Sequence, residues 1–169
     1  MIAITNGKRG KSTRGLKEGE IMANVEFVQY IDTVKQATQQ ALMRAAEAIG
    51  QHMESHAKLY ITEGVYRSPE SDWYIRTGNL RNSITHITEE YDGDIYCIVG
   101  STVEYAPYVE LGTGVYAEGG GRATPWSYQD SKGEWHTTTG MPPRPFLRPA
   151  VERHLDEYRQ VLQHELAKP

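Results

Sequence analysis

The longest periodic pattern of apolar residues runs from residue 24 to residue 61. Apolar side chains recur there every three or four positions, which is the spacing of one buried stripe on an α-helix. Asn24 is a suitable N-cap, and Gly50 is a position at which the helix could kink. A helix of this length is on the order of 55 Å long. A small domain cannot cover all of it, so we expect part to pack on another element or subunit. The stripe consists of Phe27, Ile31, Val34, Ala41, Ala45, Ile49, Met53, Ala57 and Tyr60.

Two shorter segments after this helix predict a β-hairpin. They are Ile84–Glu90 and Ile95–Ser101, and Tyr91-Asp92-Gly93-Asp94 lies between them. Asp-Gly favours a two-residue hairpin turn, because both central positions of such a turn take positive φ. The first segment alternates poorly between apolar and polar residues, so the turn is the main basis of this prediction.

A short helix is predicted on each side of the hairpin. Thr77 is a suitable N-cap for the first, which we expect to end at Ser83. The second is Tyr105–Leu111, since Pro107 suits the first turn of a helix and Gly112 suits its C-terminal stop.

The segment Thr113–Pro143 is long for a connection within a compact domain. Arg122–Gln129 and Glu134–Thr139 could pair as strands across Asp130-Ser131-Lys132-Gly133. We therefore expect a projecting loop or hairpin. It would carry Trp126, Tyr128 and Trp135.

A last helix is predicted from about Pro149 to about Leu166. Its buried face would consist of Ala150, Val151, Leu155, Tyr158, Leu162 and Leu166. The predicted elements form an α+β fold, in which a long N-terminal helix and a C-terminal helix pack on a small antiparallel sheet.

Charge divides the chain into an arm and a body. Residues 1–21 carry five bases and two acids and lack periodicity, so we expect a flexible basic arm. Residues 22–169 are expected to form a single domain with an insertion at about 115–142. Lys17-Glu18-Gly19 is what a purine-rich ribosome-binding site encodes, so Met22 is an alternative start.

Between Arg81 and Arg122 there is no Lys or Arg, whereas seven acids occur. They are Glu89, Glu90, Asp92, Asp94, Glu104, Glu110 and Glu118. A surface of one negative sign repels DNA. The alternative interpretation is a solvated acidic loop.

Other features of composition concern assembly and compartment. Eleven Tyr against two Phe suits surfaces that become buried on assembly, although Tyr could also replace Phe in a small core. The single Cys97 excludes an internal disulfide and is typical of a reducing compartment. No run approaches the roughly 18 apolar residues of a membrane span, so we expect no membrane partner.

Candidate reactive groups are sparse. His52 and His56 have a spacing that can clamp a metal ion, but Met53 occupies the position where metalloproteases have Glu. Solvent-facing or inter-subunit roles are therefore favoured. Cys97 is expected to be a buried small side chain rather than a nucleophile.

Two further groups lie in the long segment. Asp130, Glu134 and His136 would form an acid–base site only if the fold assembled them, and exposed loop polarity is the simpler interpretation. Gly119-Gly120-Gly121 lacks the strand, the helix and the Gly-Lys-Ser/Thr ending of a phosphate loop. We therefore predict no catalytic residue, no metal and no cofactor.

Three short phrases consist of turn and packing residues. They are Thr77-Gly78-Asn79-Leu80-Arg81, Tyr105-Ala106-Pro107-Tyr108-Val109-Glu110-Leu111-Gly112-Thr113 and Pro145-Phe146-Leu147-Arg148-Pro149-Ala150. In this order they resemble the tailed-bacteriophage neck family, described as minor tail component, head–tail joining or tail-completion protein. The resemblance covers roughly Arg76 to Glu152, and the long helix agrees in type only.

The resemblance implies a non-enzymatic structural protein of the virion neck or tail, assembled in the host cytoplasm. Such proteins form a ring, usually six-fold, that joins tail to head, and DNA passes through its opening without specific binding. The expected partners are further copies of the chain, in a hexamer, and neighbouring terminator, stopper or adaptor proteins. The basic arm and the Trp-rich insertion depart from the compact pattern of the family.

Physical roles follow for individual residues. Gly78 and Gly112 would serve turns, and Phe146 and Leu147 would anchor the last helix. Glu110, Arg81 and Arg148 are candidates for charge pairs that fix loops. Further structural or interface candidates are Leu80, Tyr105, Tyr108, Trp126 and Trp135. Glu89, Glu90, Asp92 and Asp94 are candidates for a lumen wall.

Three alternatives remain open. A tail-terminator or head-closure (stopper) ring protein is the nearest in structure. A metal-dependent hydrolase is distant, and it would depend on His52 and His56. A DNA-binding accessory protein would bind through residues 1–21.

Overall fold

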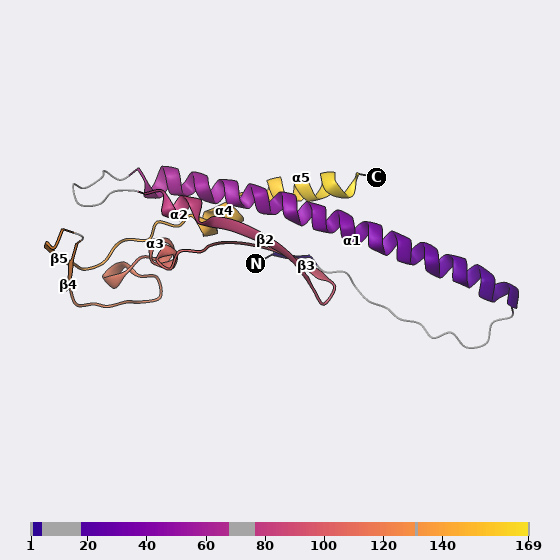
Figure 1. Cartoon of the computed structure of the whole chain (residues 1–169), viewed down its shortest axis with the longest axis horizontal. Coiled ribbons are helices and arrows are strands. Elements are labelled where there is room, and N and C mark those ends of the chain that lie inside the picture. The colour runs from indigo at the N-terminus through magenta and orange to yellow at the C-terminus, as the bar shows by residue number, and fades with distance from the viewer. Residues whose placement is uncertain (1, 5–17, 68–76, 131, 169) are drawn as a thin grey trace. The chain divides into compact units, whose positions relative to one another are not determined.

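The computed structural model of the chain describes residues 2–4, 18–67, 77–130 and 132–168, with side chains from residue 31 onward (Figure 1). Two compact units are present. The first comprises Met1–Gly50, Ile87–Ile98 and Asp156–Pro169, and the second comprises Gln51–His86 and Val99–Leu155. The predicted α+β fold is confirmed, because long helical segments combine with small antiparallel sheets.

The predicted long helix is present as α1, Glu18–Tyr60, and a π-helical turn, η1 (Ile61–Val65), follows it. The predicted start at Asn24 is wrong, since α1 already includes Glu18. Gly50 is buried within an unbroken helix. No helix in the described part of the chain is both long and apolar enough to cross a lipid bilayer.

The predicted basic arm falls largely outside the described residues. The described residues of this arm are Ile2–Ile4, which form strand β1, and residues 18–21, which belong to α1; residues 5–17 lie outside them.

The first unit contains the tip of the predicted hairpin. Strands β2 (Ile84–Tyr91) and β3 (Asp94–Ser101) flank a turn in which Asp92 and Gly93 have φ of 52° and 85°. Strand β1 pairs antiparallel with β3, in the sheet order β1-β3-β2. Thr88 Oγ1 donates to the Glu47 carboxylate at 3.1 Å, which joins β2 to α1. Buried side chains of this unit include Ala41, Ala45, Ala46, Ile49, Ile95, Cys97 and Tyr158.

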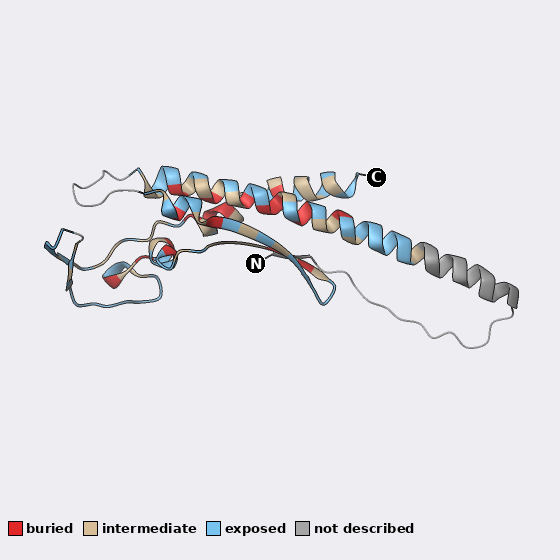
Figure 2. Cartoon of the chain, in the orientation of Figure 1, coloured by how far each residue is buried: buried red, intermediate tan, exposed pale blue. Residues whose placement is uncertain are grey.

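The second unit holds the main apolar core. Its members come from α1, η1, β2 and three short helices: α2 (Asn79–Asn82), α3 (Ala106–Leu111) and α4 (Leu147–Glu152), together with the residue at the N-cap of α4. Figure 2 shows the buried residues of this core in red. The core residues are Ala57, Ile61, Leu80, Ile84, Ala106, Phe146 and Ala150.

The start of α2 differs slightly from the prediction. Gly78, with φ of 77°, occupies the N-cap position that we expected for Thr77. Thr77 Oγ1 still accepts the N–H of Asn79, at a long 3.4 Å. The left-handed backbone explains the exchange, because glycine adopts it without steric cost.

The prediction of a single C-terminal helix is wrong. Two helices are present, α4 and α5 (Leu155–Leu166), and Arg153 and His154 separate them. Tertiary contacts to Tyr60 engage both residues: the Arg153 guanidinium lies 5.7 Å from the ring centroid, and His154 Nε2 lies 3.2 Å from the hydroxyl.

Glu54 joins α1 to the start of β2. Lys58 Nζ donates to its Oε1, and His86 Nδ1 lies 2.7 Å from its Oε2. The hydrogen bond from Lys58 is the main cause that lowers the pKa of Glu54 below its ordinary value of 4.5; burial opposes this effect and His86 adds to it. The stabilisation is therefore fully present above pH 4.5 and is lost as the pH falls through the folded-state pKa.

Replacing Glu54 with glutamine is expected to lower the melting temperature at neutral pH. It should also flatten the decline in melting temperature below pH 4.5, because the ionisation that stabilises the fold is gone. Thermal unfolding followed across this pH range measures both effects. Glu63→Gln, at an exposed position, is the matched control. An unchanged acid decline in the Glu54 variant would show that another group causes it.

Candidate functional site

Glu110 lies where two of the three phrases meet. Its side chain belongs to α3, is 8% exposed, and accepts three backbone N–H groups at the start of α4. Oε2 accepts from Phe146 at 2.7 Å and from Leu147 at 2.9 Å, while Oε1 accepts from Arg148 at 2.9 Å. The first N–H groups of a helix have no partner within the helix. A buried carboxylate therefore satisfies them and complements the positive helix end.

Arg81 and Arg148, which were also candidates for charge pairs, do not contribute their side chains to the contact with Glu110. Arg148 instead forms a two-pronged ion pair with Glu118, with N···O distances of 2.8 and 3.3 Å. Glu118 raises the pKa of Arg148. The backbone N–H of Arg81 lies 3.4 Å from the hydroxyl of Tyr66. The start of α4 is thus held by two separate contacts: the Glu110 carboxylate accepts from its backbone amides, and the Arg148 side chain pairs with Glu118.

A crossing of two backbone segments follows Glu110. Thr113 N–H donates to the Met141 carbonyl at 2.9 Å, and Val115 N–H donates to the Thr139 carbonyl at 3.0 Å. Gly114 and Gly140, with φ of 60° and 123°, lie at the crossing point. A Cβ at Gly114 would overlap the Thr139 carbonyl, and one at Gly140 would overlap the Thr113 carbonyl. Only glycine fits at these two positions.

Replacing Gly114 with alanine is expected to reduce the free energy of unfolding by about 2 kcal/mol, because the added Cβ forces the crossing segments apart and the backbone is left-handed. Urea unfolding measures this loss. The matched control is Gly64→Ala, since nothing lies within 4 Å of a Cβ added at Gly64. Equal losses in the two variants would contradict the close approach at Gly114.

The outward side of α3 is aromatic. Tyr105, Tyr108 and Leu111 recur at helical spacing, opposite the buried Ala106 and Glu110. The 3₁₀ turn η2 (Gly114–Tyr116) adds Val115 and Tyr116 to the exposed apolar residues. We call these five residues the tyrosine face: Tyr105, Tyr108, Leu111, Val115 and Tyr116.

The predicted hairpin within the insertion is confirmed. Strands β4 (Trp126–Gln129) and β5 (Trp135–Thr138) pair antiparallel, with Trp126 opposite Thr138 and Gln129 opposite Trp135. One side of the hairpin is half-buried and includes Trp126, over which the Arg122 guanidinium lies 5.6 Å from the ring centroid. The other side is exposed, and we call it the hairpin face: Ser127, Gln129, Trp135 and Thr137.

Asp130 closes the turn of this hairpin. Its Oδ1 accepts the N–H groups of Lys132 and Glu134, both at 2.9 Å, and its Oδ2 lies 2.9 Å from His136 Nε2. The hydrogen bond with His136 is the main cause that lowers the pKa of Asp130.

Ligand-type atoms of Asp130, Glu134 and His136 lie within 4.8 Å of one another, so the three residues that the sequence offered for an acid–base site do come together. Turn closure accounts for the pair formed by Asp130 and His136, because both Asp130 oxygens already have hydrogen-bonding partners.

The remaining candidates for reactive groups are Cys97, His52 and His56. Cys97 is 7% exposed, and burial raises the pKa of its thiol, which disfavours the reactive thiolate. His52 is exposed, and the half-buried His56 stacks on His154 with ring centroids 3.5 Å apart.

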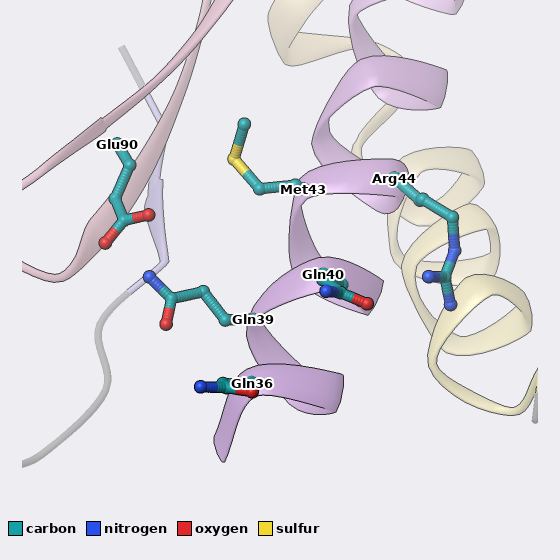
Figure 3. Close-up of a pocket in the computed structure, with 6 residues that line it drawn as sticks. All are labelled: Gln36, Gln39, Gln40, Met43, Arg44 and Glu90. Atoms are coloured by element: carbon teal, nitrogen blue, oxygen red, sulfur yellow. The ribbon is translucent and has the colours of Figure 1, made fainter. Parts of the chain in front are cut away.

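The acidic candidates lie at the tip of the β2–β3 hairpin. Glu89, Glu90 and Asp92 are exposed, whereas Asp94 is half-buried. Glu90 also borders an open hollow on the first unit (Figure 3). Gln39 and Met43 point from α1 toward Glu90, and Arg44 points away from it. Three of its lining residues are glutamines, whose amides can donate and accept hydrogen bonds. Its lining residues are Gln36, Gln39, Gln40, Met43, Arg44 and Glu90.

Sequence reasoning missed the partners that make this site. The sequence singled out Glu110 but not the three amides that it binds, and it did not single out Gly114, Glu118 or Gly140. The repeated glycines in Leu111-Gly112-Thr113-Gly114 were an available signal of close backbone approach.

Comparison with known proteins identifies one class. Residues 25–112 match the model of the HK97-gp10-like family, whose description reads "Bacteriophage HK97-gp10, putative tail-component". The matched segment includes α1, the β2–β3 hairpin and α3 with Glu110. No curated protein and no solved structure is significantly similar to the chain.

Proposed function

The chain belongs to the HK97-gp10-like family of bacteriophage tail components, and we propose that it completes the tail and joins it to the head as a ring around the DNA channel. Membership of this family implies a structural, non-enzymatic role in the virion tail. The specific role in the neck, the ring and the join to the head are our proposal.

The observation that carries the proposal is the contact between Glu110 and the start of α4, which we call the frame. It connects the second and third neck-type phrases through three hydrogen bonds to a buried carboxylate. The same frame leaves the tyrosine face and the hairpin face exposed. Rigid packing beneath exposed aromatic surfaces suits a part that becomes buried on assembly.

We further propose that the ring is a hexamer that contacts a terminator, a stopper or an adaptor protein. Genomic DNA would pass through the ring without specific binding. Exposed Glu89, Glu90 and Asp92 suit a channel wall, because like charge prevents adhesion of the phosphate backbone.

Phage that lacks this protein tests the proposal. We expect full heads and tails of normal length that remain unjoined, with joining restored by the wild-type chain in trans. Electron microscopy of the particles would also reveal a ring at the head–tail junction of the complemented phage. Tails of abnormal length would favour a terminator instead, and heads that lose their DNA would favour a stopper.

Replacing Glu89 and Asp92 with lysine tests the channel wall. We expect DNA ejection to become slower and sensitive to salt, because the lysines attract phosphates. Ejection at the wild-type rate, with intact particles, would place these residues away from the DNA.

A further inference from the structure

The turn of the β4–β5 hairpin brings together three side chains of the kinds that bind transition metals. Asp130 directly follows β4, Glu134 directly precedes β5, and His136 is the second residue of β5. Ligand-type atoms of the three lie within 4.8 Å of one another. Side chains alternate along a strand, and His136 is paired with Tyr128, so the even-numbered positions of both strands share one side of the hairpin.

The spacing of Asp130 and His136 is close to that of two ligands on one zinc ion. Oδ2 of Asp130 lies 2.9 Å from Nε2 of His136. Zinc lies about 2.0–2.2 Å from nitrogen and oxygen ligands, so two ligands of a tetrahedral site are about 3.4 Å apart. A small widening therefore admits the ion. Zinc would take the place of the hydrogen between the two atoms, and the neutral imidazole would carry its proton on Nδ1.

Asp130 is held in position for this role. Its side chain is only 3% exposed, and its Oδ1 accepts the N–H groups of Lys132 and Glu134, both at 2.9 Å. Hydrogen bonds to the atoms of a ligand that do not touch the metal fix its orientation and strengthen binding. Oδ1 therefore supports the carboxylate, while Oδ2 is directed toward His136.

The set of ligand atoms favours zinc. One imidazole nitrogen and two carboxylates match its known ligands, whereas magnesium and calcium prefer oxygen alone. Glu134 is exposed, so an ion can enter from solvent. With three protein ligands, the fourth position of a tetrahedral ion remains for water.

The hairpin would gain stability from such an ion. Strands β4 and β5 form a sheet of their own, and a two-stranded hairpin is marginally stable in water. A metal ion that joins the end of β4 to β5 adds its binding free energy to the folded form. Trp135 lies between two of the ligands and is 72% exposed, so the ion would also fix the backbone that carries this side chain.

We propose that Asp130, Glu134 and His136 bind one zinc ion, with water as the fourth ligand, and that the ion closes the turn of the hairpin. The site departs from the sequence-based prediction of no metal, because the sequence did not show that the fold assembles these side chains. Zinc binding depends on this turn and on neither the ring nor the join to the head.

Competition with a chromophoric zinc chelator tests the site in the full chain. We expect one ion per chain, and Glu134→Gln and His136→Phe should each weaken binding at least about 10-fold. Glu134 bonds within the turn through its backbone N–H and carbonyl, so its variant should keep the hairpin, as circular dichroism verifies. Glu104→Gln, also at an exposed position, is the matched control. Excess magnesium should not displace the zinc.

Three further measurements locate the ion. His52→Gln removes one of the two histidines on α1 whose spacing suits a metal, and it should bind zinc as the wild type does. In nuclear magnetic resonance spectra, the Nε2 hydrogen of His136 should disappear when zinc is added. The backbone amides of Lys132 and Glu134 should exchange more slowly with zinc than without it, because the ion holds the turn closed.

The remaining outcomes would overturn the inference. They are a wild-type chain that binds no zinc, equal binding in the wild type and both ligand variants, and weakening in only one of those variants. Loss of binding in His52→Gln would assign the ion to α1 instead. None of these results bears on the proposed neck ring, which images of the phage particles test separately.

Discussion

Replacing Phe146 with alanine is expected to lower the free energy of unfolding by about 3–5 kcal/mol. The side chain is 0% exposed and is among the largest fully buried ones in the described part of the chain. Removing the phenyl ring of Phe146 takes apolar surface out of the core and leaves a cavity that the surrounding helices cannot fill.

Urea unfolding followed by circular dichroism measures this loss. Leu155→Ala is the control, because Leu155 is 41% exposed and its truncation should cost no more than about 0.5 kcal/mol. An unfolding midpoint for Phe146→Ala close to that of the wild type would mean that Phe146 does not pack in the core.

Replacing Glu110 with glutamine is expected to cost about 3 kcal/mol, because the amides of α4 lose a charged acceptor within a buried site. One carboxylate oxygen becomes an NH₂ group, which cannot accept a hydrogen bond, so either the bond from Arg148 or those from Phe146 and Leu147 are lost. Glu110→Asp keeps the charge but shortens the side chain, so it should recover only part of the stability.

Glu118→Gln is the matched control for Glu110. It also removes a carboxylate beside α4, but its ion pair with Arg148 is exposed, so the loss should be at most about 1 kcal/mol. Hydrogen exchange provides a second measurement, since the amides of residues 146–148 should exchange faster in Glu110→Gln only. A larger loss of stability for Glu118→Gln would reverse our ranking of the two contacts.

Much of the fold could be predicted because it depends on local chemistry. The Asp92-Gly93 turn, the proline and glycine around α3 and the periodicity of α1 each act within a few residues. Both hairpins were predictable for this reason. The break between α4 and α5 was not, because contacts to Tyr60, distant in sequence, engage Arg153 and His154.

The candidate site was predictable only in part, for a similar reason. Glu110 could be singled out as a charged residue within an otherwise turn-like phrase. Its partners lie 36 to 38 residues further along the chain and are backbone amides, which every non-proline residue has. No pattern of side chains can identify them. The glycine crossing depends equally on two segments distant in sequence.

The crossing at Gly114 and Gly140 has a consequence for how such a protein can diversify. The chain leaves the frame and returns to it at one point, since Val115 and Thr139 are joined by a hydrogen bond. The segment between these two residues is therefore a branch, a loop whose two ends are already in contact. The entropic cost of closing such a loop changes only slowly with its length. The branch is therefore a natural site for grafting: a foreign hairpin could replace it and change which partner is recognised, while Glu110 and the core beneath remain the same.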